Sequence, residues 1–442
     1  MKKILNTHNL QETVFWIFVC SFYCLFKRVP LKMYLWHTCV LWVFKKKILI
    51  VNIGSSTLKF HLYDMCKNIL IKGICSSKKD KAKIKYVIIK DKEKEYIKET
   101  NSKIDFVSTM LKVLKDSKII KKYNEIVLIG HRIAHGGFKF NESVIVNEFV
   151  ENEMKNLFEF APLHIPYSTK GYFQLKKAIP TAKHVFSFDT SFYNTLLEEN
   201  YLYPIPYEYF QKYNIKKYGA HGLSHNYLYK EAKKYCADDT KFITCHLGGG
   251  SSVSAIKNGI CINTSMGFTP IDGVVMCTRT GRIDPSIIPY LCKKENKSAD
   301  EIIEIFNKKS GLLGISQISS DFELLETFAK KGEKRAKLAV EMYVKSISSI
   351  ICDYVMELNG CDCIVFGGGI GENSSYLRRK VISRLNKVLS IDLDFKNNIN
   401  NKEGIISTKN SNISILLIHT NEEEIILNDI FKLFIENNYI TE

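Results

Sequence analysis

The sequence predicts an α/β fold that consists of two similar halves. From residue 47 onward, short apolar runs of strand length alternate with segments whose apolar residues recur at helical spacing. An apolar run, a polar residue and a tight turn of glycine and serine occur at 50–57 and again at 244–251. This repeat indicates that the same supersecondary unit is present in each half of the chain.

The expected elements follow in chain order and include one hairpin in each half. We expect strands at residues 47–53, 57–63, 126–130, 184–188, 242–247, 252–256 and 413–418. We expect helices at residues 104–114, 227–235, 336–358 and 422–435. Because turns of this kind bring backbone amides close to phosphate groups, the two hairpins indicate a nucleotide held between the halves.

The composition is that of a globular protein long enough for two domains. The 442 residues are 45% hydrophobic and 25% charged, and the formal net charge is +17. A positive balance suits anionic ligands such as nucleotides, but lysine is abundant throughout, which favours a general compositional bias. The basic run at 78–92 lacks interleaved aromatic residues, so we interpret it as solvated surface and expect no nucleic acid partner.

Thirteen cysteines are scattered along the chain, and no CxxC pair occurs. Cys361 and Cys363 stand close together but have no histidine cluster beside them. The pattern predicts neither a disulfide framework nor a zinc site. Free cysteines are typical of proteins in a reducing compartment, and we therefore expect a cytoplasmic protein.

Residues 1–46 differ from the rest of the chain. All three tryptophans lie there, together with apolar runs at 14–26 and 33–44. Each run is shorter than the ~20 residues that a membrane-spanning helix needs. Three interpretations stay open: a misassigned start codon, an interfacial anchor that would make the only membrane contact, and an arm of unknown role.

Several polar residues stand where expected strands end or in glycine-rich loops, which is where α/β proteins bind ligands. Arg132 follows one strand, and Asp189 ends another. His221 lies in a bend before a helix, and Arg279 lies in a loop. A guanidinium group matches a carboxylate or phosphate. The competing interpretation is a surface salt bridge and a structural histidine.

The segment 365–373 combines an apolar run, three consecutive glycines and the start of a helix. Such a turn can hold adenosine or phosphate against the helix N-terminus. It is not a Walker A loop, because no Gly-Lys-Ser/Thr follows, and no acidic residue completes a Rossmann fingerprint. Glu422, after the last expected strand, could hold magnesium or simply stabilise the start of the final helix.

Together these motifs resemble the acetate kinase family from about residue 47 to the C-terminus. The stretches that carry the resemblance stand in the family's order: VNIGSSTLKF, GHRIAHGG, APLHIP, FDTSF, YGAHGLSH, CHLGGGSSV, NTSMGFTP, CTRTGRIDP, SGLLGISQISSDF, FGGGIGENS and TNEE. The resemblance implies two RNase H-like domains of the actin, Hsp70 and sugar kinase type around a nucleotide cleft. It places these domains at 47–190 and 191–422, with the final helix, 423–442, packing back on the first.

The resemblance also implies reversible phosphoryl transfer between ATP and acetate or another short-chain carboxylate, with Mg²⁺ or Mn²⁺, in a homodimer. Asn52 and Glu422 match the family's metal-associated residues. The residues that match its nucleotide-binding segments are Ser55, Thr57, Lys59, His246, Leu247, Gly248, Gly249, Gly250, Asp321, Phe322, Glu323, Gly369, Ile370, Gly371, Glu372 and Asn373.

Four residues match the family's catalytic and substrate positions. Asp189, His221 and Arg279 match its catalytic residues, and Arg132 matches an arginine that holds the substrate. A carboxylate acceptor is already ionised at neutral pH and needs no base. We therefore expect Asp189 to orient an arginine or the water around the metal, and not to transfer a proton.

Four positions depart from the family's usual residues. Tyr193 stands in place of histidine, Gly249 of asparagine, Arg282 of aspartate and Glu323 of arginine. These changes leave the details of nucleotide binding open. They remove none of the matched metal, catalytic or substrate residues, so we expect an active enzyme.

The residues that match the family's pocket for the substrate's alkyl end are Ala134, Leu163, Ala220 and Pro270. Ala134 and Ala220 replace a valine and a phenylalanine, so we expect a larger pocket. A propionate or butyrate kinase is therefore the nearest alternative. Two others stay open: a sugar kinase or Hsp70-like ATPase on the same fold, and a membrane-tethered pseudokinase without activity.

Overall fold

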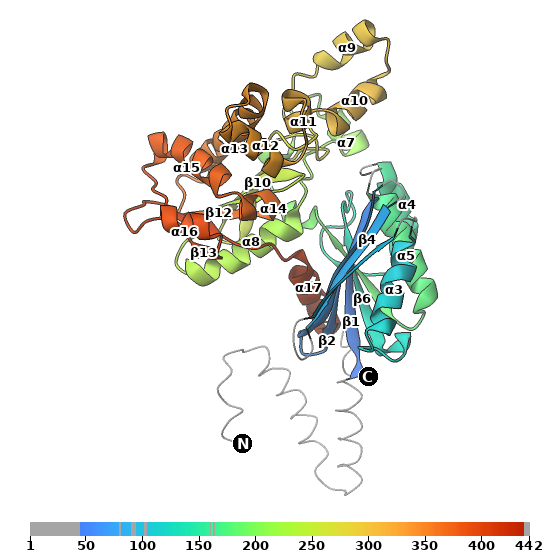
Figure 1. Ribbon diagram of the computed structural model, residues 1–442. Coiled ribbons are helices and arrows are strands. Elements are labelled where there is room, and N and C mark those ends of the chain that lie inside the picture. Colours follow the sequence, from blue (N-terminus) through green and yellow to red (C-terminus); the bar gives the residue numbers. More distant parts are fainter. Residues whose placement is uncertain are drawn as a thin grey trace, which may run out of the picture.

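The computed structural model describes residues 45–78, 81–89, 94–100, 104–159, 161 and 164–436. Nearly all of the predicted N-terminal extension therefore lies outside the described residues. In the part that is described, no helix is long and apolar enough to cross a membrane. The described chain forms two lobes, each built on a β-sheet (Figure 1).

The sheet of the first lobe has eight strands in the order β5-β4-β3-β2-β1-β6-β8-β7. Its strands are β1 Lys47–Ile53, β2 Thr57–Asp64, β3 Ile69–Lys78, β4 Lys81–Ile88, β5 Lys94–Thr100, β6 Ile126–Ile133, β7 Val144–Ile145 and β8 Lys183–Phe188. β1 pairs antiparallel with β2 and parallel with β6, which pairs parallel with β8. β1 reads as a continuous apolar run because helices cover both of its faces.

The sheet of the second lobe repeats this plan. Its six strands stand in the order β11-β10-β9-β12-β14-β13. They are β9 Lys241–Leu247, β10 Ser251–Lys257, β11 Ile260–Thr264, β12 Cys363–Gly367, β13 Gly404–Ile405 and β14 Ser414–Leu417. β9 pairs antiparallel with β10 and parallel with β12, as β1 does with β2 and β6. The predicted duplicated α/β fold is confirmed.

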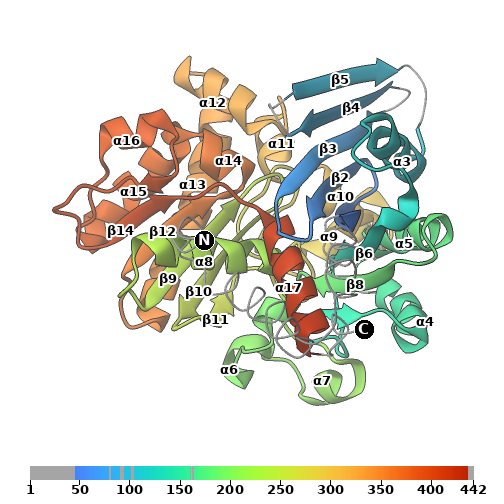
Figure 2. The same cartoon turned by 90° about the horizontal axis from the view of Figure 1, so that it is seen from below.

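Helices form three layers around the two sheets. Their bounds are α3 Phe106–Asp116, α4 Glu148–Asn156, α5 Ile165–Ala178, α6 Glu198–Tyr201, α7 Glu208–Tyr213, α8 Gly222–Tyr235, α9 Ile287–Glu295, α10 Ala299–Lys308, α11 Gly311–Ser316, α12 Phe322–Lys330, α13 Lys334–Glu357, α14 Gly368–Asn373, α15 Ser375–Leu389, α16 Phe395–Asn400 and α17 Glu422–Glu436. α3 and α5 cover the outer face of the first sheet, and α13 and α15 pack on the second. α17 and α8 lie between the sheets (Figure 2).

The final helix α17 returns to the first sheet, where it contacts β1, β6 and β8. Gly130 on β6 permits this close approach, because a Cβ atom there would lie 2.6 Å from Cγ2 of Ile426. One buried cluster joins residues of both sheets with α8 and α17. The sheets lie within 47–188 and 241–417, and the predicted domain boundary at 190/191 stays a prediction.

Most expected elements occur within a few residues of their expected bounds. The helix expected at 227–235 begins earlier, at Gly222, so that its N-terminus adjoins His221. The basic run at 78–92 was interpreted as solvated surface, yet residues 81–88 form strand β4. Its lysines are exposed and its apolar residues alternate with them, so the run is both a strand and a charged face.

Candidate active site

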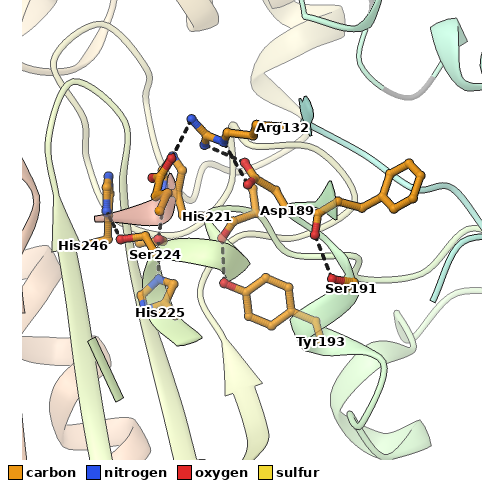
Figure 3. Close-up of polar contacts among 12 residues, drawn as sticks. Arg132, Asp189, Ser191, Tyr193, His221, Ser224, His225 and His246 are labelled. Atoms are coloured by element: carbon orange, nitrogen blue, oxygen red, sulfur yellow. Dashed lines mark hydrogen bonds and ion pairs between the residues drawn. The ribbon is translucent and has the colours of Figure 1, made fainter. Parts of the chain in front are cut away.

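Arg132 lies near the end of β6 and joins three separate elements. Its Nε donates to Oδ1 of Asp189 at 3.0 Å, and its Nη2 donates to Oδ2 at 2.6 Å (Figure 3). Its Nη1 lies 3.0 Å from Oε2 of Glu422, at the start of α17. Parallel pairing of β6 with β8 brings Arg132 and Asp189 together, and the return of α17 adds Glu422.

Two carboxylates share the single charge of Arg132. Burial raises the pKa of Glu422 to about 7, although Arg132 alone would lower it, and Asp189 raises it further. Burial by itself would lower the pKa of Arg132, but Asp189 and Glu422 outweigh burial and raise it. At pH 7 Glu422 is therefore only partly ionised, and a further cation beside it would favour its charged form.

The donor chemistry around Arg132 fits a magnesium ion. Mg²⁺ prefers oxygen ligands and usually takes one or two carboxylates together with phosphate oxygens and water. Glu422 and Asp189 offer carboxylates, and Asn52 on β1 offers an amide oxygen from a half-buried position. No contact between Asn52 and Glu422 is found in the described chain, so the role of Asn52 stays a prediction.

Arg279 is a half-buried cation with no carboxylate partner among the residues that the structure describes. Its Nη1 donates to the carbonyl of Pro270 at 3.2 Å and lies 3.9 Å from Sδ of Met276. Burial lowers the pKa of Arg279, yet an arginine stays charged in proteins. A half-buried charge without a counter-ion favours the binding of an anion at this point.

Two histidines lie beside each other next to the arginines. The rings of His221 and His246 are 4.3 Å apart between centroids. Burial, then the nearby charge of His246 and of Arg132, lowers the pKa of His221 well below its usual range. Burial and then Arg132 lower the pKa of His246 to about 3. Both rings are therefore neutral at pH 7. They can stabilise an anion by donating a hydrogen bond, but they bring no positive charge.

The glycine turn between β9 and β10 adjoins His221 and Arg279. A Cβ atom on Gly250 would lie 3.3 Å from Nε2 of His221 and 3.5 Å from Nη1 of Arg279. A Cβ atom on Gly248 would lie 3.9 Å from the backbone nitrogen of Gly369, in the second glycine segment. The turn, the two side chains and that segment therefore border one space, whereas the Leu247 side chain points into the core.

The space above Gly249 is open, since a Cβ atom there would meet nothing within 4 Å. We expect Gly249→Asn to fold normally and to lower KM for ATP by roughly 3–10-fold, the effect of one added hydrogen bond to phosphate. Initial-rate kinetics at varied ATP would measure this. The matched control is Gly250→Asn, whose Cβ would lie 3.2 Å from Cε1 of His221 and should lower kcat. An unchanged KM in Gly249→Asn would contradict the prediction.

The predicted nucleoside residues lie around the start of α12. Asp321 caps this helix by accepting a hydrogen bond from the backbone N–H of Glu323 at 2.9 Å. Phe322 is 4% exposed and packs against Tyr343 in the core. Its ring therefore belongs to the core, and the nucleotide contacts of Asp321, Phe322 and Glu323 stay predictions.

The second glycine segment, 365–373, is held in place by hydrogen bonds of the Glu372 and Arg378 side chains. Glu372 accepts hydrogen bonds from the backbone N–H and the hydroxyl of Thr420, at 2.9 and 2.7 Å. The fully buried Arg378 donates to the carbonyls of Gly371 and Glu372 at 2.6 and 2.9 Å. Arg378 was not identified from the sequence, because it stands in an ordinary basic stretch, Arg378-Arg379-Lys380, that carries no motif. Ile370 is partly buried against the core, and the amide of Asn373 donates to the Gly369 carbonyl at 2.8 Å.

The first hairpin presents its predicted phosphate residues at its tip. The N–H of Gly54 donates to the carbonyl of Thr57 at 2.8 Å, and Ser55 and Lys59 are exposed. The charge of Lys59 is close enough to lower the pKa values of Glu422 and His246, as the last of several causes. The hairpin therefore belongs to the same electrostatic environment as the second lobe.

The predicted alkyl-pocket residues Ala134 and Ala220 belong to different apolar clusters, and the pocket stays a prediction. Ala220 packs with Met266 and Met276, near Arg279 and its partner Pro270. Ala134 instead adjoins a separate apolar cluster of the first lobe. Leu163 lies outside the described residues.

Two further features were missed in the sequence. His164, at the start of α5, feels both arginines: loss of hydration, then repulsion from Arg279 and Arg132, lowers its pKa. His164 lies in the APLHIP stretch, and this position could have indicated that it belongs to the site. Cys236, Asp239 and Cys363 each offer a metal-ligand atom within 4.8 Å of the others. Cys363 is far from the other two in sequence, which hid the cluster.

The repeated strand order and the facing glycine turns define the actin, Hsp70 and sugar kinase type of fold. The chain matches the acetokinase family over residues 47–428, and it belongs to that family. It is 42% identical over 396 residues to the acetate kinase of Treponema denticola, covering 87% of this chain and 98% of the relative. It is 43% identical over 396 residues to that of Methanosarcina mazei, covering 87% and 96%.

Solved structures give the same result. The acetate kinase of Porphyromonas gingivalis superposes with a TM-score of 0.79 at 35% identity, over 88% of this chain and all of that one. A propionate kinase from Francisella tularensis superposes with a TM-score of 0.80 at 37% identity, over 87% and 98%. Fold similarity alone therefore does not separate the two acids.

Proposed function

We propose that this chain transfers the terminal phosphoryl group of ATP to acetate, reversibly, giving acetyl phosphate and ADP. The observation that carries the proposal is the half-buried Arg279, without a carboxylate partner in the described chain, beside the neutral His221 and the open glycine turn. These groups suit a site where an anionic acceptor meets an anionic phosphate. The relatives in the same family are named acetate kinases.

The chemistry follows from charge and position. An acetate oxygen forms a bond to the terminal phosphorus, and the bond from that phosphorus to the bridging oxygen of ADP breaks. Acetate is already ionised at neutral pH, so no proton is removed. Both oxygens of Asp189 accept hydrogen bonds from Arg132, which is the arrangement expected of an orienting group. Arg279 and His221 would offset the charge repulsion between the two anions.

A magnesium ion belongs to the proposal, held by Glu422 with Asn52 and Asp189 as the other candidate ligands. When bound, it would screen the phosphate charges. We expect Glu422→Gln to raise the Mg²⁺ concentration needed for half-maximal activity, on the order of 10-fold or more. Titrating Mg²⁺ at saturating substrates would measure it. The matched control is Glu423→Gln, and equal Mg²⁺ dependence in both variants would show that Glu422 merely begins the helix.

A homodimer and a cytoplasmic location complete the proposal, and both rest on the resemblance to the family. Light scattering coupled to size exclusion would give the mass in solution. The membrane contact considered for residues 1–46 is not part of the proposal.

Propionate is the second candidate substrate, favoured by the small Ala220 and by the propionate kinase among the structural neighbours. We expect the efficiency ratio of propionate over acetate to fall in Ala220→Phe, because the ring refills space beside Met266 and Met276. The discrimination per methylene is about 1–3 kcal/mol. Met side chains are flexible enough to fill the space themselves. An unchanged ratio in Ala134→Val/Ala220→Phe would contradict the enlarged pocket.

The direct experiment is a hydroxamate assay of acyl phosphate formed from ATP and each of acetate, propionate and butyrate. Acetyl phosphate formation at a rate that depends on both substrates supports the proposal. ATP hydrolysis without acyl phosphate would overturn it.

A further inference from the structure

Four side chains of the second lobe form an unbroken hydrogen-bonded chain that ends at His221. Oγ1 of Thr244 on β9 lies 2.7 Å from Nδ1 of His225 on α8. Nε2 of His225 lies 2.7 Å from Oγ of Ser252 on β10, and that oxygen lies 2.9 Å from Nδ1 of His221. Thr244, His225 and Ser252 are fully buried. His221 is the residue before α8 and His225 lies in the first turn of that helix (Figure 3).

Counting hydrogens restricts this chain to three states. A neutral imidazole carries one N–H, and a hydroxyl carries one O–H. Burial, followed by the charge of neighbouring histidines, lowers the pKa of His225 well below its usual range, as it does for His221. The hydrogen bonds therefore run from Thr244 toward His221, or from His221 toward Thr244, or Ser252 accepts from both histidines. In this last state the buried Ser252 hydroxyl would have no acceptor for its own hydrogen among the described residues, which is unfavourable. The two single directions remain.

The two directions differ at the far end of the chain. If the bonds ran toward Thr244, its hydroxyl would accept from His225 and its own hydrogen would need another acceptor. In the part of the chain that the structure describes, Oγ1 of Thr244 has no hydrogen-bond partner besides His225. A buried donor without an acceptor is less favourable than an oxygen whose lone pairs stay unused. The bonds therefore run from Thr244 toward His221.

We propose that Thr244, His225 and Ser252 are positioning residues that hold His221 in the tautomer with its hydrogen on Nε2. Nδ1 of His221 then accepts from Ser252, and the Nε2–H faces the space above the Gly248–Gly250 turn. This inference rests on the proposed phosphoryl transfer at that space. A Cβ atom on Gly250 would lie 3.3 Å from Nε2, and Nε2 has no partner within the described residues.

The tautomer decides whether His221 attracts or repels a phosphoryl group. Phosphate oxygens accept hydrogen bonds, so an Nε2–H stabilises them, whereas a bare Nε2 lone pair would face their lone pairs. Because the ring is neutral, it cannot supply a hydrogen on both nitrogens. We call the buried residues Thr244, His225 and Ser252 the relay. The relay selects the tautomer of His221, which the His221 ring by itself does not fix.

Nitrogen-15 NMR of histidine-labelled enzyme tests the tautomer without any substrate. The His221 signals are assigned from their loss in His221→Gln. We expect a protonated Nε2 and an unprotonated Nδ1 in the resting enzyme. A protonated Nδ1, or a mixture of both forms, would overturn the inference.

Steady-state kinetics test the consequence. Ser252→Ala removes the donor to Nδ1, and we expect kcat to fall roughly 10-fold, the scale of one buried hydrogen bond, with little change in KM for ATP or acetate. The matched control is Ser254→Ala, on the same face of β10, whose hydroxyl contacts Tyr193 and Thr264 outside the relay. Thr244→Val should also lose rate, while Thr244→Ser should retain it. Normal kcat in both Ser252→Ala and Thr244→Val would refute a positioning role.

The NMR measurement of the tautomer and the assay of acyl phosphate formation test this inference and the proposed function separately. An Nε2–H tautomer in an enzyme that makes no acyl phosphate would refute the function and leave the relay intact. Acyl phosphate formation with an Nδ1–H tautomer would refute the relay and leave the function intact.

Discussion

Arg279→Ala is expected to lower kcat by about 10²–10³-fold, the scale seen when a donor to developing charge is removed. Arg279 has no carboxylate partner in the described chain, so its charge is available to the reacting anions. For the same reason its removal breaks no ion pair, and the melting temperature should change little. The measurement is initial-rate kinetics at saturating ATP and acetate, together with thermal unfolding.

Arg282→Ala is the matched control for Arg279. Arg282 lies in the same loop but is exposed, and its backbone N–H, not its side chain, bonds to Gly273 at 3.0 Å. Its loss should leave kcat within a small factor. Arg279→Lys should recover part of the rate, because it keeps the charge but loses the planar fork. Near-normal turnover in Arg279→Ala would contradict the assignment.

Arg132→Ala should be the more damaging change, because it affects both rate and stability. The side chains of Asp189 and Glu422 are 4% and 14% exposed and would lose their shared counter-charge. Breaking a buried pair in this way costs about 3–5 kcal/mol. We also expect kcat to fall at least as far as in Arg279→Ala, since Asp189 would no longer be oriented.

Thermal unfolding and kinetics on Arg132→Ala, Arg132→Lys and Arg279→Ala separate the two arginines. Only the Arg132 variants should lose marked stability. A second experiment adds Asp189→Asn to Arg132→Ala, which removes one of the stranded charges and should restore part of the stability. Equal melting temperatures for Arg132→Ala and the unmodified protein would show that this cluster does not support the fold.

The duplicated fold could be predicted because its signal is local. Each half begins with an apolar strand followed by a glycine–serine turn, and the strand order is repeated around these hairpins. Strand β4 and the edge strand β5 were missed because both are rich in charged residues. In β4, buried Ala82 and Ile84 alternate with exposed lysines, a period of two that the high charge concealed.

The site could be predicted as a set of residues but not as a set of contacts. Motifs pointed to Arg132, Asp189 and Glu422 separately, whereas their shared ion pairs depend on α17 returning across the first sheet. The same limit explains Phe322, whose neighbour in sequence faces solvent while its own ring packs on Tyr343. Both the ion pairs of Arg132 and the burial of the Phe322 ring depend on long-range packing, which no local sequence pattern predicts.

The measurement that tests the account most directly is acyl phosphate formation from ATP and acetate by the unmodified protein, compared with Arg279→Ala. We predict a rate that requires both substrates and falls about 10²–10³-fold in the variant. ATP hydrolysis that is independent of acetate, or transfer to a sugar hydroxyl in its place, would contradict the account.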